Sequence, residues 1–284
     1  MTRIRLAYSL VWIAILLAFG VPTAAPAAGI ELSATTIKQG EAVEVTVYVS
    51  EVGRNPVLRF GGRVWPLYRI GQEGLRTYIG TDPFTRPGTQ RITVESGARK
   101  GVVLFSRGIT VQRVSFPTRR LRLDPDKFAL LDPKLIAIER QKVGTALRYL
   151  SSGQHWDGAF IVPVEGRRTS PYGVISVYQG RRRGWHRGTD FAAPVGTPVY
   201  AANHGIVRLA EPVPVSGNAV FIDHGFGVVT SYLHMSAIYV KAGQRVRKGT
   251  LIGAVGATGL STGPHLHWAL RTNGVLVDPL PWTR

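Results

Sequence analysis

Three observations predict a mainly β protein. The chain holds 33 glycines and 18 prolines in 284 residues, and they cluster between short segments rich in Val, Ile, Phe and Thr. A hydrophobic content of 44% is ample for a globular core. Only residues 133–150 show the apolar spacing of a long helix. We therefore expect a small N-terminal β-sandwich-like module, a helical connector and a C-terminal antiparallel β-rich domain.

Composition restricts the function classes. Without cysteine the chain is neither a disulfide scaffold, a cysteine protease nor a thiolate zinc finger. Lys and Arg outnumber Asp and Glu by 35 to 17, a formal charge of +18. Such a surplus indicates an anionic partner: nucleic acid, phospholipid head groups or an acidic polymer.

Residues 1–27 have the pattern of an export signal. Arg3 and Arg5 precede an apolar run over residues 6–19, and a small-residue stretch ends at Ala27. The run is shorter than the roughly 20 residues that a bilayer span needs, which favours cleavage near Ala27 over an uncleaved membrane anchor. We expect a periplasmic or secreted protein. Export removes nucleic acid from the expected partners, and the protein would contact the membrane only if the signal stays uncleaved. An anionic polymer of the cell envelope is then the expected partner.

Residues 28–112 are predicted to form a small antiparallel β-sandwich of immunoglobulin-like size. The strand candidates are residues 43–49, 57–60, 91–94 and 101–105. The Cys-Trp-Cys signature of a true immunoglobulin domain is absent from the sequence. Nothing in this stretch has a catalytic pattern.

Residues 113–157 are predicted to form a structured connector. Asp132 supplies an N-cap and Pro133 a first-turn proline for a helix over residues 133–150. A basic cluster comes first, at Arg119, Arg120 and Arg122. The helix carries one apolar stripe, formed by Ile136, Val143, Leu147 and Leu150. This stripe would dock the helix on a neighbouring domain.

Residues 158–284 are predicted to form the domain that carries the chemistry. Its strand candidates are residues 198–201, 205–210, 219–223, 228–234, 251–255 and 266–270. Six of the seven histidines lie after residue 160. Titratable, metal-capable side chains are thus concentrated in one β-rich domain.

Four of the histidines and one aspartate lie on strand-like segments. His186 and Asp190 flank a glycine, so an extended segment would place both on one face. His265 and His267 share a strand face, with Leu266 and Trp268 on the other. Two histidines and one carboxylate are the ligand count of a catalytic zinc site, which keeps a fourth position open for water.

The fourth of these histidines, His234, closes the predicted strand over residues 228–234. Strict alternation places it on the same face as Tyr232, with Val229 and Leu233 on the opposite, core-facing side. Each histidine motif alone is a weak signal, because His and Asp recur by chance at such spacings.

Three motifs contain these residues: His186-Arg187-Gly188-Thr189-Asp190, Tyr232-Leu233-His234 and Gly263-Pro264-His265-Leu266-His267-Trp268. Together they resemble the motifs of the lysostaphin-like, or LytM-type (M23), zinc metallopeptidases, which cut peptides in bacterial peptidoglycan. The spacers agree as well, among them Ser170-Pro171-Tyr172-Gly173 and residues 256–263. The resemblance covers about residues 160–279. Upstream, the chain looks more weakly like the N-terminal part of Gram-negative, two-domain members.

This resemblance implies a function and a role for each residue. His186, Asp190 and His267 would hold one zinc ion per chain, and His234 and His265 would be catalytic histidines that do not bind metal. The His-Glu-x-x-His motif is absent, so a histidine is the consistent general base, without a choice between the two. The implied reaction is hydrolysis of peptide cross-links between stem peptides. The bond is D-alanyl to diaminopimelate in Gram-negative relatives and within glycine bridges in some Gram-positive ones.

Other residues have weaker patterns. The histidines at His155, His204 and His224 are interpreted as structural. Three tyrosines, Tyr172, Tyr178 and Tyr232, are candidate transition-state donors left outside the catalytic set. The run at residues 181–183, three arginines, is either a solvated loop or a clamp for a stem-peptide carboxylate or the anionic wall.

Two rival functions remain. A non-catalytic LytM-type regulator would bind and activate a cell-wall amidase without zinc, but such proteins usually lose ligand residues, and all are present here. A polysaccharide-binding envelope protein explains the charge and the β module but not the four placed histidines and Asp190. The N-terminal module could block the cleft, bind the wall or contact an envelope partner protein, and positive charge fits all three.

Overall fold

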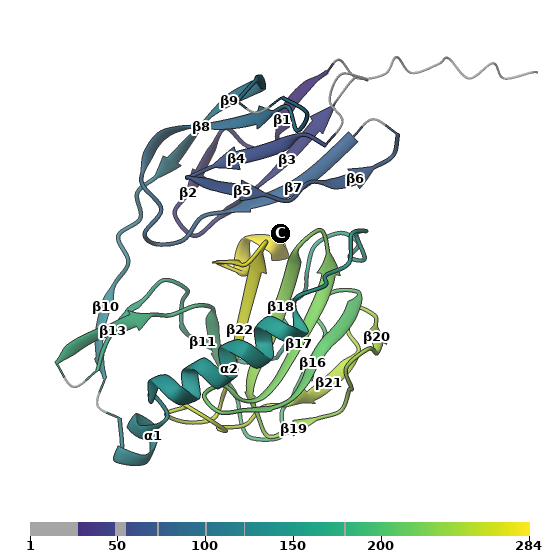
Figure 1. Ribbon diagram of the computed structural model, residues 1–284. Coiled ribbons are helices and arrows are strands. Elements are labelled where there is room, and N and C mark those ends of the chain that lie inside the picture. The colour runs from purple at the N-terminus through teal and green to yellow at the C-terminus, as the bar shows by residue number, and fades with distance from the viewer. Residues whose placement is uncertain (1–27, 49–54, 73, 100, 122, 179) are drawn as a thin grey trace, which may run out of the picture.

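The computed structural model describes residues 28–48, 55–72, 74–99, 101–121, 123–178 and 180–284. Two β-rich modules are joined by a connector that carries the helices (Figure 1). The expected fold class is confirmed. The predicted export signal lies outside the described residues, and within them no helix is long and apolar enough to span a membrane.

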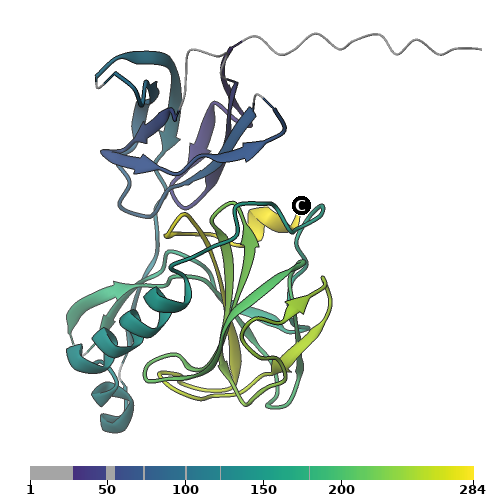
Figure 2. The same ribbon diagram turned by 45° about the vertical axis from the view of Figure 1, so that its right-hand side comes forward.

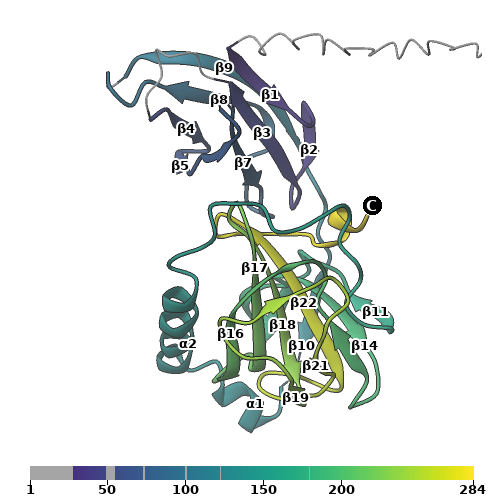
Figure 3. The ribbon, with the colours of Figure 1, turned by 90° about the vertical axis from the view of Figure 1, so that its right-hand side faces the viewer.

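The N-terminal module consists of two sheets that enclose an apolar core. One sheet has the strand order β1-β3-β7-β6 and the other β2-β9-β8-β4-β5; Figure 3 shows them as two layers. The strands are β1 (Gly29–Leu32), β2 (Thr36–Lys38), β3 (Ala42–Tyr48), β4 (Val57–Phe60), β5 (Arg63–Trp65), β6 (Tyr68–Ile70), β7 (Gly74–Gly80), β8 (Gly88–Glu95) and β9 (Val103–Gln112). Side chains at Val43, Val45 and Val47 alternate into the core, as expected for strands buried on one face.

Several strand predictions in this module need correction. Strand β4 matches its predicted range, β3 ends at Tyr48 with Val49 outside the described residues, and β8 is longer than predicted. Strand β9 begins at Val103 because residues before it form a turn, and it runs on to Gln112. The sandwich is not wholly antiparallel, since β2 pairs with β9 in parallel. Short strands such as β2 and β5 carry too few residues to show a period-two pattern.

The connector contains strand β10 (Thr118–Leu121) and helices α1 (Pro125–Ala129) and α2 (Pro133–Ala146). Asp132 caps α2 as predicted, with its side chain accepting a hydrogen bond from the backbone nitrogen of Lys134 at 2.8 Å. The helix ends at Ala146, short of the predicted residue 150, because Gly144 and Thr145 are poor helix formers in its last turn.

The C-terminal domain is built on one large sheet of order β11-β14-β22-β18-β17-β16-β20. Its strands are β11 (Arg167–Ser170), β14 (Thr189–Ala192), β16 (Gly205–Val213), β17 (Gly217–Gly225), β18 (Val228–Met235), β20 (Arg245–Val246) and β22 (His265–Thr272), with β23 (Val275–Val277) beside β22. A small sheet of β15 (Pro198–Tyr200), β21 (Leu251–Ala254) and β19 (Ala237–Ile238) covers part of the core, and η1 (Leu280–Thr283) ends the chain. Figure 2 shows α2 beside this domain, away from that small sheet.

The two faces of the large sheet have different roles. Tyr232, Leu266 and Trp268 point into the main core and are fully buried. The other face, which we call the open face, is covered at one end by α2, whose Val143 and Leu147 pack against a cluster containing Phe221. The predicted docking stripe is therefore confirmed for these residues, while Ile136 lies over a cleft beside the cluster.

A separate three-stranded sheet joins the connector to the C-terminal domain. Strand β10 pairs in parallel with β12 (Ile175–Tyr178), which pairs with β13 (Arg181–Trp185). This pairing was not expected from the sequence, because two of the four residues in Thr118–Leu121 are arginines and the partner strand lies more than fifty residues away.

The two modules pack tightly on each other. Asn273, in the turn after β22, accepts a hydrogen bond from the Tyr68 hydroxyl at 2.8 Å and donates one to the backbone oxygen of Tyr78 at 3.0 Å. The ring of Tyr78 belongs to the C-terminal core and lies 5.4 Å from that of Trp282. The N-terminal module is thus anchored at the far end of β22.

Acidification is expected to destabilise the domain through His224. Its Nδ1 donates to the backbone oxygen of His204 at 2.7 Å, and its Nε2 lies 2.8 Å from Thr230 Oγ1. Burial lowers the pKa of His224 from 6.5 to about 4. Between these values the unfolded chain binds more protons than the folded one, so the free energy of unfolding should fall by about 3 kcal/mol as the pH drops from 6.5 to 4.

Urea unfolding at pH 7 and pH 4 measures this effect. Other groups also titrate in that range, so the comparison is between wild type and His224→Gln. The variant should lose less stability over the same interval. Equal losses in both proteins would contradict the assignment to His224.

Candidate metal centre

A cross-strand row on the open face brings four side chains together. Ser170 on β11 lies opposite Asp190 on β14, Asp190 opposite His267 on β22, and His267 opposite Leu233 on β18. Directly opposed residues of antiparallel strands project to the same face. His265 lies one step along the face, opposite Ala192. The predicted shared face of His265 and His267 is confirmed.

His186 reaches this row from a break between β13 and β14. The segment is not one continuous strand as predicted, but the turn still brings His186 Nε2 to 2.8 Å from Asp190 Oδ1. Gly188, inside the turn, lies against β22. A Cβ atom there would come within 2.8 Å of His267 Nε2 and closer still to the backbone oxygen of Trp268, so only glycine fits.

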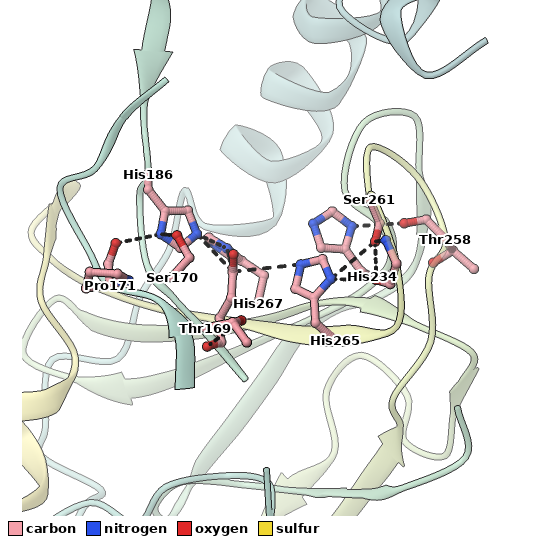
Figure 4. A network of polar contacts seen from close by, with 11 residues as sticks. Thr169, Ser170, Pro171, His186, His234, Thr258, Ser261, His265 and His267 are labelled. Carbon is pink, nitrogen blue, oxygen red and sulfur yellow. Dashed lines mark hydrogen bonds and ion pairs between the residues drawn. The ribbon is translucent and has the colours of Figure 1, made fainter. Parts of the chain in front are cut away.

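Three ligand atoms converge in the row, and Figure 4 shows the rings of His186 and His267 there. His267 Nδ1 lies 2.8 Å from Asp190 Oδ1 and 3.0 Å from His186 Nε2. All three residues are buried: His186 and His267 are each 9% exposed, and Asp190 is 8% exposed. Burial alone would raise the pKa of Asp190, but its hydrogen bonds to His186 and His267 outweigh burial and hold that pKa far below the usual range.

The donor set fits a zinc ion. His186 Nδ1 donates to the backbone oxygen of Pro171 at 2.8 Å, which leaves the Nε2 lone pair directed at the row. Two imidazole nitrogens and one carboxylate oxygen are the ligands of catalytic zinc sites. Among the described residues, His186, Asp190 and His267 form the one group of three ligand side chains whose atoms lie within 4.8 Å of one another. The structure therefore places the three residues expected as ligands in one metal site.

Two more histidines lie beside the three ligands. His265 Nδ1 donates to the backbone oxygen of Gly263 at 2.8 Å, and His234 Nδ1 to that of Thr258 at 2.9 Å. Both rings therefore keep an unprotonated Nε2. For His265 that atom lies 3.8 Å from Asp190 Oδ1. The rings of His234 and His265 are 5.0 Å apart, and Figure 4 shows them side by side.

The prediction that His234 shares a strand face with Tyr232 is wrong. Tyr232 points into the core, whereas Leu233 lies on the open face opposite His267. His234 joins the open face because its φ of 66° breaks the alternation of the strand. Burial lowers the pKa of His234 to about 3, with smaller contributions from His267 and His265, so the ring is neutral near pH 7.

The connector holds the loops around His234. Glu139 on α2 accepts hydrogen bonds from the backbone nitrogens of Val215 at 2.6 Å and Ser216 at 3.0 Å. The backbone oxygen of Ser216 in turn accepts from the nitrogen of His234 at 3.0 Å. On the other side, Lys127 of α1 donates to the backbone oxygen of Gly259 at 2.6 Å. The strained backbone of His234 is thus supported by two loops that the connector ties down.

The site opens into a cleft of about 1150 Å³. Residues of α2 form one wall, the metal-site row forms the floor, and Tyr68 of the N-terminal module lies at one end. Tyr178 also lines the cleft. Tyr172 does not, because its hydroxyl donates to the backbone oxygen of Leu276. The side chains of residues 181–183, the predicted arginine clamp, lie outside the described part of the chain.

Sequence reasoning missed several residues that surround the metal site. Ser170 Oγ lies 3.2 Å from His186 Nδ1. The Ser-Pro-Tyr-Gly spacer was noted in the sequence and could have identified this serine, but no role was assigned to it. Glu139 carried no signal, because a glutamate on a helix is usually solvent-exposed. Arg271, on the same face as His267 and four residues along β22, also lines the cleft and stood in no recognised motif.

Known proteins match this segment of the chain. The family model "Peptidase family M23" matches residues 184–279. The peptidoglycan DD-endopeptidases ShyA and ShyC of Vibrio cholerae are 52% identical over 95 residues and 47% over 94, which is 34% and 33% of this chain. The DD-carboxypeptidase/endopeptidase Mpg of Neisseria meningitidis is 50% identical over 95 residues, again 34% of the chain. The matches span only 22% of the length of each relative.

One solved structure matches over a greater length. A peptidase M23 candidate from Pseudomonas aeruginosa is 30% identical, with a TM-score of 0.62, over 86% of this chain and 93% of that one. The likeness thus includes the N-terminal module and the connector as well as the metal site. The shared fold over nearly all of that relative, together with the family match at the metal site, shows that the chain belongs to peptidase family M23.

Proposed function

We propose that this chain is an exported zinc metalloendopeptidase that hydrolyses peptide cross-links of peptidoglycan, at the bond between D-alanine and diaminopimelate. The observation that carries the proposal is the convergence of His186, Asp190 and His267 beside two further histidines with free Nε2 atoms. The names of the Vibrio and Neisseria relatives support the substrate and the DD bond. We also propose residues 1–27 as the export signal, 28–112 as the N-terminal module, 113–157 as the connector and 158–284 as the peptidase domain, in the periplasm or outside the cell.

The proposed mechanism assigns binding and proton transfer to different histidines. His186, Asp190 and His267 would hold the metal, and a bound zinc ion supplies a Lewis acid that acidifies water and polarises a carbonyl. Of His234 and His265, one accepts the proton of the attacking water at Nε2. The same ring, now an imidazolium, returns that proton from Nε2 to the leaving amine, and the other histidine hydrogen-bonds the developing oxyanion when its own Nε2 carries a proton. The backbone oxygens of Thr258 and Gly263 accept from Nδ1 of the two rings and so leave Nε2 of a neutral ring free to take the proton of the water.

The non-catalytic LytM-type regulator has weaker structural support than the peptidase. A binding module needs no buried, preorganised ligand set, and burying Asp190 with its two histidine partners has a large desolvation cost. A polysaccharide-binding protein likewise has no use for His234 in a conformation with positive φ. Both features are typical of a catalytic site.

Digestion of isolated sacculi tests the function. Purified residues 28–284, loaded with zinc, should convert cross-linked muropeptide dimers into monomers, and mass spectrometry of the products identifies the bond. A chelator should abolish this conversion and added zinc should restore it. Stoichiometric zinc without cleavage would refute the endopeptidase, and stimulation of an added amidase in the same assay would then favour the regulator.

A further inference from the structure

Arg271 is a half-buried arginine in the cleft without an acidic partner among the described residues. It projects from β22 on the same face as His267, since the two are four residues apart on one strand. Its Nε atom is buried and makes no hydrogen bond. Its guanidinium carbon lies 5.3 Å from the centre of the Phe221 ring, which holds the group against the open face.

The electrostatic environment of Arg271 does not compensate its charge. Burial is the main cause that lowers its pKa from 12.5 to about 10, and the charge of nearby Arg187 lowers it further. An arginine at that pKa is still protonated at neutral pH. A half-buried charge without a partner is only partly compensated by solvent, so a ligand that supplies an anion here would gain a favourable charge-assisted interaction.

The lining of the cleft has the same sign of charge. Five arginines line it, at Arg119, Arg140, Arg148, Arg187 and Arg271, against two acids, Asp190 and Glu139. Both carboxylates already have hydrogen-bond partners. Asp190 contacts His186 and His267, and Glu139 accepts from the backbone nitrogens of Val215 and Ser216. The described part of the cleft therefore offers an anion several unpaired positive groups and no competing carboxylate.

We propose that Arg271, with Arg187 beside it, is the subsite that binds a carboxylate of the peptide substrate. The inference rests on the proposed peptidase function and adds a specificity determinant to it. A guanidinium binds a carboxylate through two parallel hydrogen bonds, which fixes both position and orientation. Diaminopimelate-containing stem peptides carry free carboxylates, whereas a glycine bridge carries none, so this subsite would select the former.

The position of Arg271 on β22 determines how far the bound carboxylate would lie from the peptide bond that is cut. Four residues of strand separate the Cα atoms of His267 and Arg271 by about 13 Å. An extended peptide advances about 3.3 to 3.6 Å per residue, so the carboxylate lies within about four residues of the bond that is cut. Figure 1 shows β22 running from the metal-site end of the domain towards the N-terminal module. The substrate would therefore lie along the floor of the cleft in that direction.

Paired substrates test the subsite. The probes are a cross-linked stem-peptide dimer with free carboxylates and the same dimer with those groups as primary amides. Wild type should cut the free form about 10- to 100-fold more efficiently in kcat/KM. In Arg271→Met, which keeps the length and apolar stem of the side chain, the ratio should fall to near one. Arg271→Lys should retain part of it. Arg59→Met is the matched control, because Arg59 pairs with Glu95 on the N-terminal module, and its ratio should equal that of wild type.

Calorimetry on zinc-loaded proteins that also carry His234→Ala, which is expected to keep zinc and lose turnover, keeps the test independent of cleavage. The dissociation constants of the two peptides should differ by a similar factor in wild type and by much less in Arg271→Met. Equal affinity of wild type for both peptides, or an unchanged ratio in a folded Arg271→Met, would overturn the subsite. If wild type binds the free form selectively but cuts neither, the subsite stands and the proposed peptidase function fails.

Discussion

Replacing His186 or Asp190 by alanine should abolish both zinc retention and peptidase activity. The proposed zinc site has three protein ligands, and removal of one leaves two. Asp190 also contributes the single negative charge at the metal, and both histidines contact its Oδ1 atom at 2.8 Å. Without it, two imidazoles remain with no anion to balance the ion. We expect activity on cross-linked muropeptides to fall about 1000-fold or more, because zinc supplies the Lewis acid for hydrolysis.

Metal analysis after extensive dialysis, together with muropeptide digestion, measures both effects on one sample. His155→Asn is the matched control, since His155 lies outside the cleft and its loss changes the histidine count without changing the site. That control should keep one zinc ion per chain. Full zinc content in Asp190→Ala would remove Asp190 from the ligand set, and activity without zinc would contradict a metallopeptidase altogether.

The ligand set could be predicted from sequence because its residues lie in short, regular segments. His265, Leu266, His267 and Trp268 alternate on one strand, so their faces follow from spacing alone. His186 and Asp190 could be paired because the glycine between them marks a tight segment. What spacing did not show is why glycine is required: Gly188 lies against the backbone of β22, a contact between residues eighty positions apart.

Other features depend on contacts that no local pattern encodes. The left-handed backbone at His234 is stabilised by Ser216 and Thr258, which lie on separate loops. The start of helix α2 could be predicted from Asp132, whereas its predicted end at residue 150 was too late, and its position over the cleft depends on the side chain of Glu139. Similarly, an isolated arginine on a strand gives no signal, and the importance of Arg271 follows only from its burial beside Arg187.

The connector therefore contributes to the site in a way its sequence does not reveal. Glu139 and Lys127 bind the two loops that hold the backbone of His234, from α2 and α1 respectively. The connector is in turn joined to the domain by the parallel pairing of β10 with β12. This arrangement gives a physical reason for a structured segment between the modules where a flexible linker would suffice to join them.

Replacing His234 by alanine should leave the zinc content intact and lower kcat about 100- to 10,000-fold, the usual contribution of a positioned acid or base. Among the described residues, His234 lies outside the group of ligand atoms within 4.8 Å of one another, and its Nδ1 donates to the backbone oxygen of Thr258. The side chain is 8% exposed, so the variant leaves a small cavity and should be checked for folding by circular dichroism. A drop in kcat with KM little changed is expected, because the ring acts on the reacting water or the oxyanion and not on the peptide in its ground state.

Comparison of His234→Ala with His186→Ala separates proton transfer from metal binding. Both variants should be inactive, but only the second should lose zinc, and added zinc should restore neither to wild-type turnover. His265→Ala provides the internal comparison, since its Nε2 lies 3.8 Å from Asp190 Oδ1 and its loss should resemble that of His234. Loss of zinc from His234→Ala with zinc retained by His186→Ala would reverse the roles assigned to the two histidines.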